Sequence, residues 1–186
     1  RILRSAGYDG TIILGGNIPT RLKKEFQKKW IFDLIDCLVT NQGEESIELL
    51  WKTVSSGVYN FEEIPNLFWR DKKGDFVSNP YRKLDTKDFG MPDFKGYPIG
   101  KYWGINYLPI LGARGCYYAK CSFCPIPFAW GNNGFVGFDE VEKVADFLSK
   151  ASERYNINNY SFVEEAMHAK QLAKLSEIII ENDKNI

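Results

Sequence analysis

The sequence lacks the features by which nucleic-acid-binding, membrane-spanning and secreted proteins are usually recognised. Its 186 residues carry 24 basic and 24 acidic side chains, so no surplus of positive charge would attract nucleic acid. No apolar run approaches the ~20 residues that cross a membrane, and no signal peptide is visible. Histidine occurs once, as His168. We therefore expect a soluble protein of the cytoplasm, with neither nucleic acid nor a membrane as its partner.

Cysteine is also scarce, but three of the four cysteines lie within nine residues, as Cys116, Cys121 and Cys124. Three thiolates this close converge on one metal more easily than they pair as disulfides, and clustered free thiols suit a reducing compartment. Three ligands are one fewer than a closed structural zinc or ferredoxin-type site requires. An incomplete shell is typical of a catalytic metal, because its open position can bind a substrate. The loop therefore predicts a metal centre.

A distant fourth ligand would give this loop a different function. It could then be a zinc site that stabilises a non-catalytic binding module, or a ferredoxin-like electron-transfer centre. The candidates are Cys37 and His168. Cys37 lies in the apolar run 34–39, where a cysteine is usually a small buried residue, and His168 is interpreted as a surface or loop histidine. Colour and iron content distinguish these alternatives, because a zinc site is colourless.

Hydrophobic patterning predicts an α/β chain that opens with alternating strands and helices. The expected strands are 10–14 and 34–39, and the expected helices are 20–29 and 43–56. Thr20 is a candidate N-cap of the first helix, and Gly57 is expected to end the second. Residues 66–70 and 75–78 flank a turn and predict a hairpin, which a connector rich in proline and glycine follows. Because this connector contains aromatic residues, we expect it to pack on a surface as an ordered linker.

The alternating pattern then resumes as the beginning of a parallel barrel. Residues 107–111 and 159–163 are expected strands, and Val141, Val144, Ala145 and Leu148 form the apolar stripe of the helix between them. In such barrels the chemistry lies at the carboxyl ends of the strands. The cysteine loop and the pair Glu164–Glu165 both occupy that position. The expected divisions are an α/β segment at 1–60, a linker with a hairpin at 61–104, and the start of the barrel at 105–186.

The residues around the cysteines resemble the cluster loop of the radical S-adenosylmethionine enzymes. The resemblance lies in a short apolar strand, then Gly112 to Gly115, the three cysteines, and an aromatic residue directly before the last one. In that family the usual spacing is C-x3-C-x2-C, whereas this loop has C-x4-C-x2-C, which changes the loop geometry but not the ligand count. The resemblance implies that the three cysteines bind three irons of a [4Fe–4S] cluster. The fourth iron would then bind S-adenosylmethionine.

The same resemblance suggests roles for further residues and a reaction. Phe123 falls where the family places an aromatic beside the adenine ring, and Glu164 or Glu165 matches the acidic motif that meets the amino group of the cofactor. The two acids could instead stabilise the N-terminus of the next helix through its dipole. An electron donor such as flavodoxin or ferredoxin would reduce the cluster, and a 5′-deoxyadenosyl radical would abstract hydrogen from a substrate. No residue identifies that substrate or a catalytic side chain.

The first segment resembles the back half of the cobalamin-binding domain that precedes many radical S-adenosylmethionine barrels. The matching residues are the strand ending at Gly15 and Gly16, then residues 36–39, 43–45 and 92–94. The resemblance implies that the paired glycines let the backbone approach the cofactor's nucleotide tail. It would make methyl transfer through cobalamin the expected chemistry. Since the chain starts at Arg1 and the remaining barrel strands are absent, we expect a fragment of a longer protein.

Overall fold

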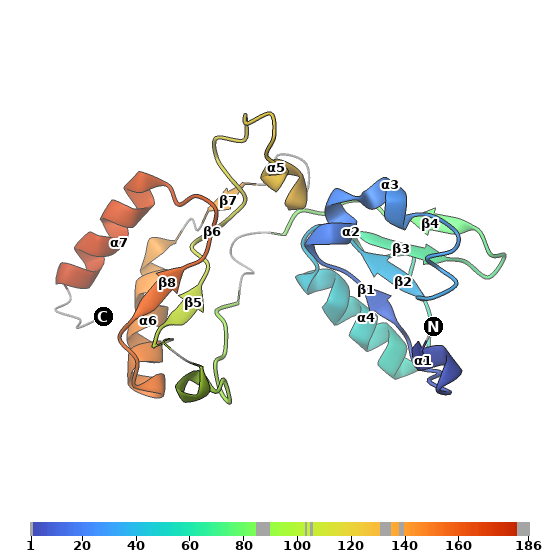
Figure 1. The fold of residues 1–186 in the computed structure, drawn as a ribbon, viewed down its shortest axis with the longest axis horizontal. Helices are drawn as coiled ribbons and strands as arrows, with labels where there is room; N and C mark the ends of the chain where they lie inside the picture. Colours follow the sequence, from blue (N-terminus) through green and yellow to red (C-terminus); the bar gives the residue numbers. More distant parts are fainter. Residues whose placement is uncertain are drawn as a thin grey trace. The chain divides into compact units, whose positions relative to one another are not determined.

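A computed structural model of the chain describes residues 2–84, 90–102, 104, 106–130, 135–137 and 140–181. The fold is mixed α/β, as the sequence predicts, and it divides into two compact units (Figure 1). Residues 1–84 and 123–133 form the first unit, and residues 85–122 and 134–186 form the second. The boundary after Ser122 therefore assigns Cys116 and Cys121 to one unit and Cys124 to the other.

A four-stranded sheet in the order β1-β2-β3-β4 organises the first unit. Its strands are β1 (Ile13–Leu14), β2 (Cys37–Val39), β3 (Leu67–Arg70) and β4 (Phe76–Ser78). β1 and β2 are parallel, and the other neighbours are antiparallel. The predicted hairpin is confirmed as β3 and β4, but it extends this sheet instead of lying in a linker at 61–104. An isolated two-stranded hairpin is at best marginally stable in water, which favours its pairing with β2.

The helices of the first unit include a short one, Ile126–Ala129, which the sequence did not predict, and they differ from the prediction between β1 and β2. They are α1 (Ile2–Ser5), α2 (Asn17–Arg21), α3 (Lys23–Phe26), α4 (Glu44–Ser56) and α5 (Ile126–Ala129). α4 ends at Gly57 in the left-handed conformation (φ 71°), as expected. The prediction of a single helix at 20–29 capped by Thr20 is wrong. Thr20 lies inside α2, and Leu22 (φ −104°, ψ 34°) separates α2 from α3.

Side chains pack on both faces of the first sheet, since successive residues of a strand point to opposite faces. Cys37 and Val39 pack with Leu50 of α4 on one face, whereas Leu38 packs with Phe68 and a cluster that includes Phe26 of α3 on the other. Cys37 is 0% exposed, in agreement with its interpretation as a small core residue. Burial, and to a lesser degree Asp36, raises the pKa of the Cys37 thiol to about 12.

The second unit contains two parallel neighbours, β5 (Leu108–Ile110) and β8 (Tyr160–Phe162). α6 (Val141–Tyr155) and α7 (Ala169–Glu181) cover them, and the predicted apolar stripe of α6 is buried there. The short strands β6 (Ala113–Arg114) and β7 (Val136–Gly137) form a separate antiparallel pair, and η2 (Ile99–Lys101) is a 3₁₀ turn. Throughout the described ranges, no helix has the length and apolar character needed to cross a membrane.

The connector before β5 is fixed to the second unit by specific contacts. Met91 and Phe94 pack against the core formed by α6 and α7. The Phe94 N–H donates to the Tyr155 hydroxyl oxygen at 3.0 Å, and that hydroxyl donates to Asp93 at 2.6 Å. The bond from Tyr155 also holds the pKa of Asp93 below its usual value. These residues therefore pack on α6 and do not form a flexible tether.

Candidate functional site

Two loops leave the second unit at the same edge of its parallel strands. Leu108 pairs with Tyr160 and Ile110 with Phe162, so β5 and β8 end side by side. The Val163 N–H donates to the Ile110 carbonyl at 2.9 Å, which extends this alignment to the last residues before the loops. The carboxyl edge of parallel strands is where α/β proteins bind ligands. The loop after β5 contains the cysteines, and the loop after β8 contains Glu164 and Glu165.

Glu164 and Glu165 have different surroundings. The half-buried Glu164 accepts the Gly112 N–H through Oε2 at 3.3 Å, which joins the two loops. Its Oε1 is buried and has no hydrogen-bond partner among the residues that the structure describes. Leaving a buried carboxylate oxygen without a donor is costly, so a ligand that brings a donor there would be favoured. Glu165 is exposed. Of the two acids, Glu164 is therefore the one with a buried oxygen that could accept a donor from a ligand.

Gly112 makes the approach of the Glu164 loop sterically feasible. A Cβ on Gly112 would lie 2.3 Å from Met167 Cε and 2.9 Å from Glu164 Oε1. Both distances are shorter than normal contacts, so a side chain here would displace the thioether, the carboxylate or both. This close approach at Gly112 could not be foreseen from its place in the cysteine loop. A glycine directly after a buried strand was its only sequence signal.

Substituting Gly112 by alanine is expected to lower the free energy of unfolding by about 1 kcal/mol, the low end of the cost of overpacking, because Met167 Cε and Glu164 Oε1 are the ends of flexible side chains that can move aside. Urea denaturation followed by circular dichroism measures this change. Gly100→Ala is the matched control, because a Cβ there would meet no atom within 4 Å. Equal stability of the two variants would contradict the close approach of Glu164 and Met167 to Gly112.

The cysteine loop contains three free thiols whose accessibility contrasts with that of Cys37. Cys116 and Cys124 are half-buried and Cys121 is exposed, and none of them forms a disulfide. Within the described part of the chain, no three His, Cys, Asp or Glu side chains are close enough to hold a metal ion. Metal binding generally brings such ligands together. The chemical type of the side chains, and not their present separation, therefore decides whether they suit a metal centre. Three accessible thiols fit an iron–sulfur centre, whereas the buried thiol of Cys37 does not.

The four-residue spacer after Cys116 contains an unusual backbone conformation. Ala119 has a positive φ of 47°, a region that costs a residue with a Cβ about 1–2 kcal/mol. Gly115, directly before Cys116, also has a positive φ of 81°, which glycine adopts without that cost. The longer first spacing of this loop therefore includes a left-handed residue. Beyond it, Phe123 is 88% exposed, so its surface is accessible to a ligand.

Gly15 and Gly16 lie exposed at the carboxyl end of β1 in the first unit. Gly16 has φ 96° and ψ −164°, a combination that is essentially restricted to glycine. A Cβ on Gly16 would meet no atom within 4 Å, whereas one on Gly15 would lie 3.4 Å from the Val39 carbonyl oxygen. Backbone conformation alone therefore requires glycine at position 16, whether or not a cofactor binds there.

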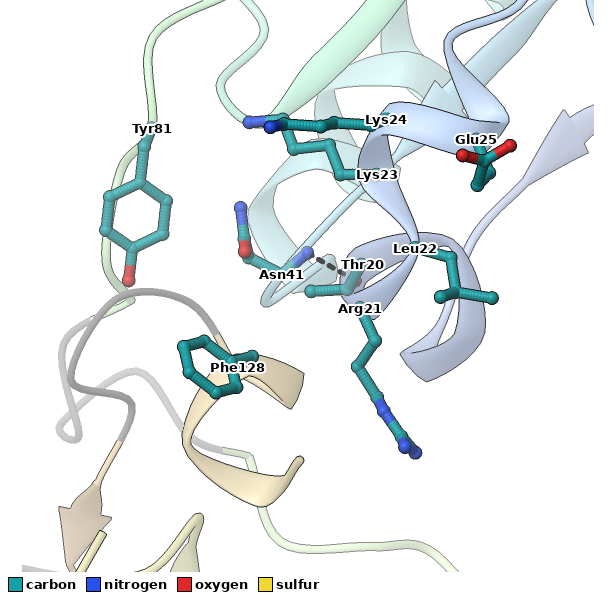
Figure 2. A pocket seen from close by; sticks show the side chains of 9 residues that line it. All are labelled: Thr20, Arg21, Leu22, Lys23, Lys24, Glu25, Asn41, Tyr81 and Phe128. Atoms are coloured by element: carbon teal, nitrogen blue, oxygen red, sulfur yellow. Dashed lines mark hydrogen bonds between the residues drawn. The ribbon is translucent and has the colours of Figure 1, made fainter. Parts of the chain in front are cut away.

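A pocket of about 570 Å³ lies in the first unit, lined by residues of α2 and α3 and by Asn41, which follows β2 (Figure 2). The Thr20 hydroxyl donates to the Gly16 carbonyl at 2.8 Å and accepts the Asn41 N–H at 2.8 Å, which fastens α2 to the end of β2. The pocket is lined by Thr20, Arg21, Leu22, Lys23, Lys24, Glu25, Asn41, Tyr81 and Phe128. Sequence reasoning missed it, because Tyr81 and Phe128 are remote from α2 along the chain.

Comparison with known proteins finds similarity in fold. No family model and no curated protein matches the chain. It superposes on the cobalamin-dependent S-adenosylmethionine radical enzyme OxsB with aqua-cobalamin bound, with a TM-score of 0.72, 20% identity and coverage of 97% of this chain and 26% of that one. The radical S-adenosylmethionine methyltransferase TsrM from Kitasatospora setae, with tryptophan substrate and a cofactor analogue bound, gives a TM-score of 0.64, 19% identity and coverage of 94% and 34%.

These similarities show a shared fold across nearly the whole chain. With 97% of this chain covered, they extend through both compact units. The chain spans only about a quarter to a third of the length of the structures that it matches. The common fold therefore corresponds to one portion of those larger enzymes.

Proposed function

We propose that the chain is part of a radical S-adenosylmethionine enzyme. Its first unit would be a partial Rossmann-like, cobalamin-binding domain, and its second unit the first βαβα portion of a (β/α) barrel. One observation carries the proposal: three free thiols and a carboxylate with an unpartnered buried oxygen follow two adjacent parallel strands. The similarity in fold to OxsB and TsrM supports it.

Each candidate residue has a role in this proposal. Cys116, Cys121 and Cys124 would hold a [4Fe–4S] cluster, and Glu164 would accept hydrogen bonds from the ammonium group of S-adenosylmethionine. Phe123 would pack beside its adenine. When bound, such a cluster would supply the electron for reductive cleavage of the cofactor. The protein's own contribution is to hold the cofactor, orient it and exclude water.

The proposed enzyme also needs partners that lie outside the chain. An electron donor such as flavodoxin or ferredoxin would reduce the cluster, and an unidentified substrate would donate the hydrogen atom. Binding of S-adenosylmethionine can be tested without either partner. The cofactor alone should alter the spectrum of a cluster that has an open iron, because it binds directly to that iron.

Anaerobic reconstitution of the full-length protein with iron and sulfide tests the proposal. We expect a brown protein with about four irons per chain, whose electron paramagnetic resonance spectrum changes when S-adenosylmethionine is added. A colourless protein that binds only zinc would replace the proposal with a zinc-stabilised binding module. A cluster that does not respond to the cofactor would indicate a ferredoxin-like electron carrier.

The pocket of the first unit supports cobalamin as a further cofactor, with methyl transfer as the associated chemistry. Its lining includes Asn41, which follows β2, and Thr20, whose hydroxyl donates to the Gly16 carbonyl after β1; open α/β sheets bind ligands at such carboxyl ends. Lys23 and Lys24 line it together with the polar side chains of Asn41 and Tyr81 (Figure 2). Cations and polar groups suit the phosphodiester and amide groups of cobalamin.

Lys24→Ala and Tyr81→Ala are expected to weaken retention of hydroxocobalamin by roughly three- to tenfold, the effect of one polar or charge-assisted contact. The measurement is the amount of corrinoid that remains bound to the full-length protein after desalting. Lys29→Ala is the matched control, because Lys29 is also exposed but does not line the pocket. Gly16→Val is a poor test, since its backbone conformation disfavours valine in any case. Retention equal to that of the unsubstituted protein in both pocket variants would contradict this site.

A further inference from the structure

The turn from β8 into α7 contacts the base of the cysteine loop at several points. We call residues 164–171 the bracket. At its start, Glu164 accepts the Gly112 N–H, and Met167 lies so near that a Cβ on Gly112 would be 2.3 Å from its Cε. At its end, Gln171 lies against Gly137, where a Cβ would be 3.0 Å from the Gln171 Nε2. The bracket therefore touches the chain both before and after the cysteines.

Aromatic contacts join the middle of the bracket to the cysteine loop. The Tyr117 ring centroid lies 5.4 Å from that of His168, with an interplanar angle of 49°. On another side, Tyr117 meets Phe135 edge-on at 5.8 Å and 79°. Tyr117 directly follows Cys116, so the position of its ring constrains the backbone of that cysteine. The contact with His168 therefore links the residue after the first cysteine of the loop to the bracket.

His168 is itself held in place by the start of α7. Its Nδ1 accepts the Lys170 N–H at 3.3 Å, and its carbonyl accepts the Gln171 N–H at 2.9 Å. These are the contacts of a residue that caps a helix N-terminus. A capped helix end is rigid compared with a free loop, so the imidazole offers Tyr117 a fixed surface.

We propose that His168 is a positioning residue, which acts through Tyr117 to fix Cys116 relative to the Glu164 carboxylate. This inference rests on the proposed function, in which Cys116 and Glu164 bind at the same site and so need a fixed position relative to each other. Cys116 would ligate the cluster, Glu164 would hold the ammonium of S-adenosylmethionine, and the cofactor must reach the open iron. Only three residues lie between Glu164 and His168, so one short segment sets both positions. Supporting groups of this kind keep a site within reactive geometry.

Two substitutions separate the ring contact from the helix cap. His168→Asn keeps an acceptor for the N-terminus of α7 but removes the ring, since asparagine is a strong capping residue. His168→Phe keeps a ring against Tyr117 but removes the Nδ1 acceptor. A structural role in capping predicts that the phenylalanine variant is the more damaged. Positioning through Tyr117 predicts the opposite order.

The first measurement uses the protein without its cluster. Alkylation of Cys116 is followed by mass spectrometry, relative to Cys121 in the same sample. We expect His168→Asn to raise this ratio by roughly two- to tenfold, the size of one aromatic contact, and His168→Phe to leave it near its original value. In a Tyr117→Ala background the effect of His168→Asn should vanish, because the two side chains act as one pair.

The second measurement uses the reconstituted full-length protein. We expect His168→Asn to retain iron but to need roughly two- to tenfold more S-adenosylmethionine for the same change in the resonance spectrum, and His168→Phe to behave like the unsubstituted protein. Unchanged alkylation and unchanged cofactor response in His168→Asn would overturn the inference while leaving the proposed function intact. Failure of the unsubstituted protein to assemble a cluster would overturn the proposed function instead.

Discussion

Replacing Cys116, Cys121 or Cys124 by alanine is expected to abolish assembly of the iron–sulfur cluster. Thiolates are the usual ligands of such clusters, and these three are the only cysteines in the loop. In the proposed cluster one iron already has no protein ligand. Losing one of the three cysteine ligands would leave two irons without one. Iron and sulfide content after anaerobic reconstitution and desalting measures the effect. We expect almost complete loss in each variant.

Cys37→Ala is the matched control for these substitutions. Its thiol lies in β2 with 0% exposure, and a pKa of about 12 keeps it protonated near neutral pH. Cluster content should therefore be unchanged, although the protein loses some stability because a small cavity is left in the core. If Cys37→Ala folded but lost its cluster, a fourth thiolate would occupy the open iron. The radical mechanism would then give way to electron transfer.

Glu164→Gln is expected to weaken binding of S-adenosylmethionine by roughly ten- to a hundredfold while the cluster still assembles. This range corresponds to the loss of one charge-assisted hydrogen bond, about 1.5–3 kcal/mol. Glutamine has the shape of glutamate and keeps an oxygen that can accept the Gly112 N–H, so the loop should retain its conformation. The measurement is a cofactor titration of the reconstituted protein, followed by electron paramagnetic resonance.

Glu165→Gln supplies the control, because Glu165 is the exposed neighbour of Glu164. It loses the same charge one residue further along the chain and should bind the cofactor as the unsubstituted protein does. Equal weakening in both variants would point to the general loss of negative charge near the ligand. Unchanged affinity in both would leave Glu164 with only its role of joining the two loops through Gly112.

Local elements were predictable where a short stretch of chain decides the conformation. Gly57 ends α4 because glycine adopts the left-handed conformation at little cost, and the buried stripe of α6 follows from helical periodicity. The region after β1 was predicted wrongly as one helix. There the Thr20 hydroxyl forms hydrogen bonds with Gly16 and Asn41, and Asn41 lies 21 residues away along the chain. Local patterns carry no signal for such a partner.

Residue types and their spacing were enough to predict the three clustered thiols as a candidate metal loop, the acids after the next strand, and the alternation that gives a mixed α/β fold. These properties depend on residue type and on near neighbours. The folded chain was needed to see that the hairpin extends the first sheet, that Glu164 rather than Glu165 accepts the Gly112 N–H, and that the His168 ring contacts Tyr117. Each of these outcomes depends on contacts between residues far apart in the chain, and packing selects among arrangements that local patterns leave equivalent.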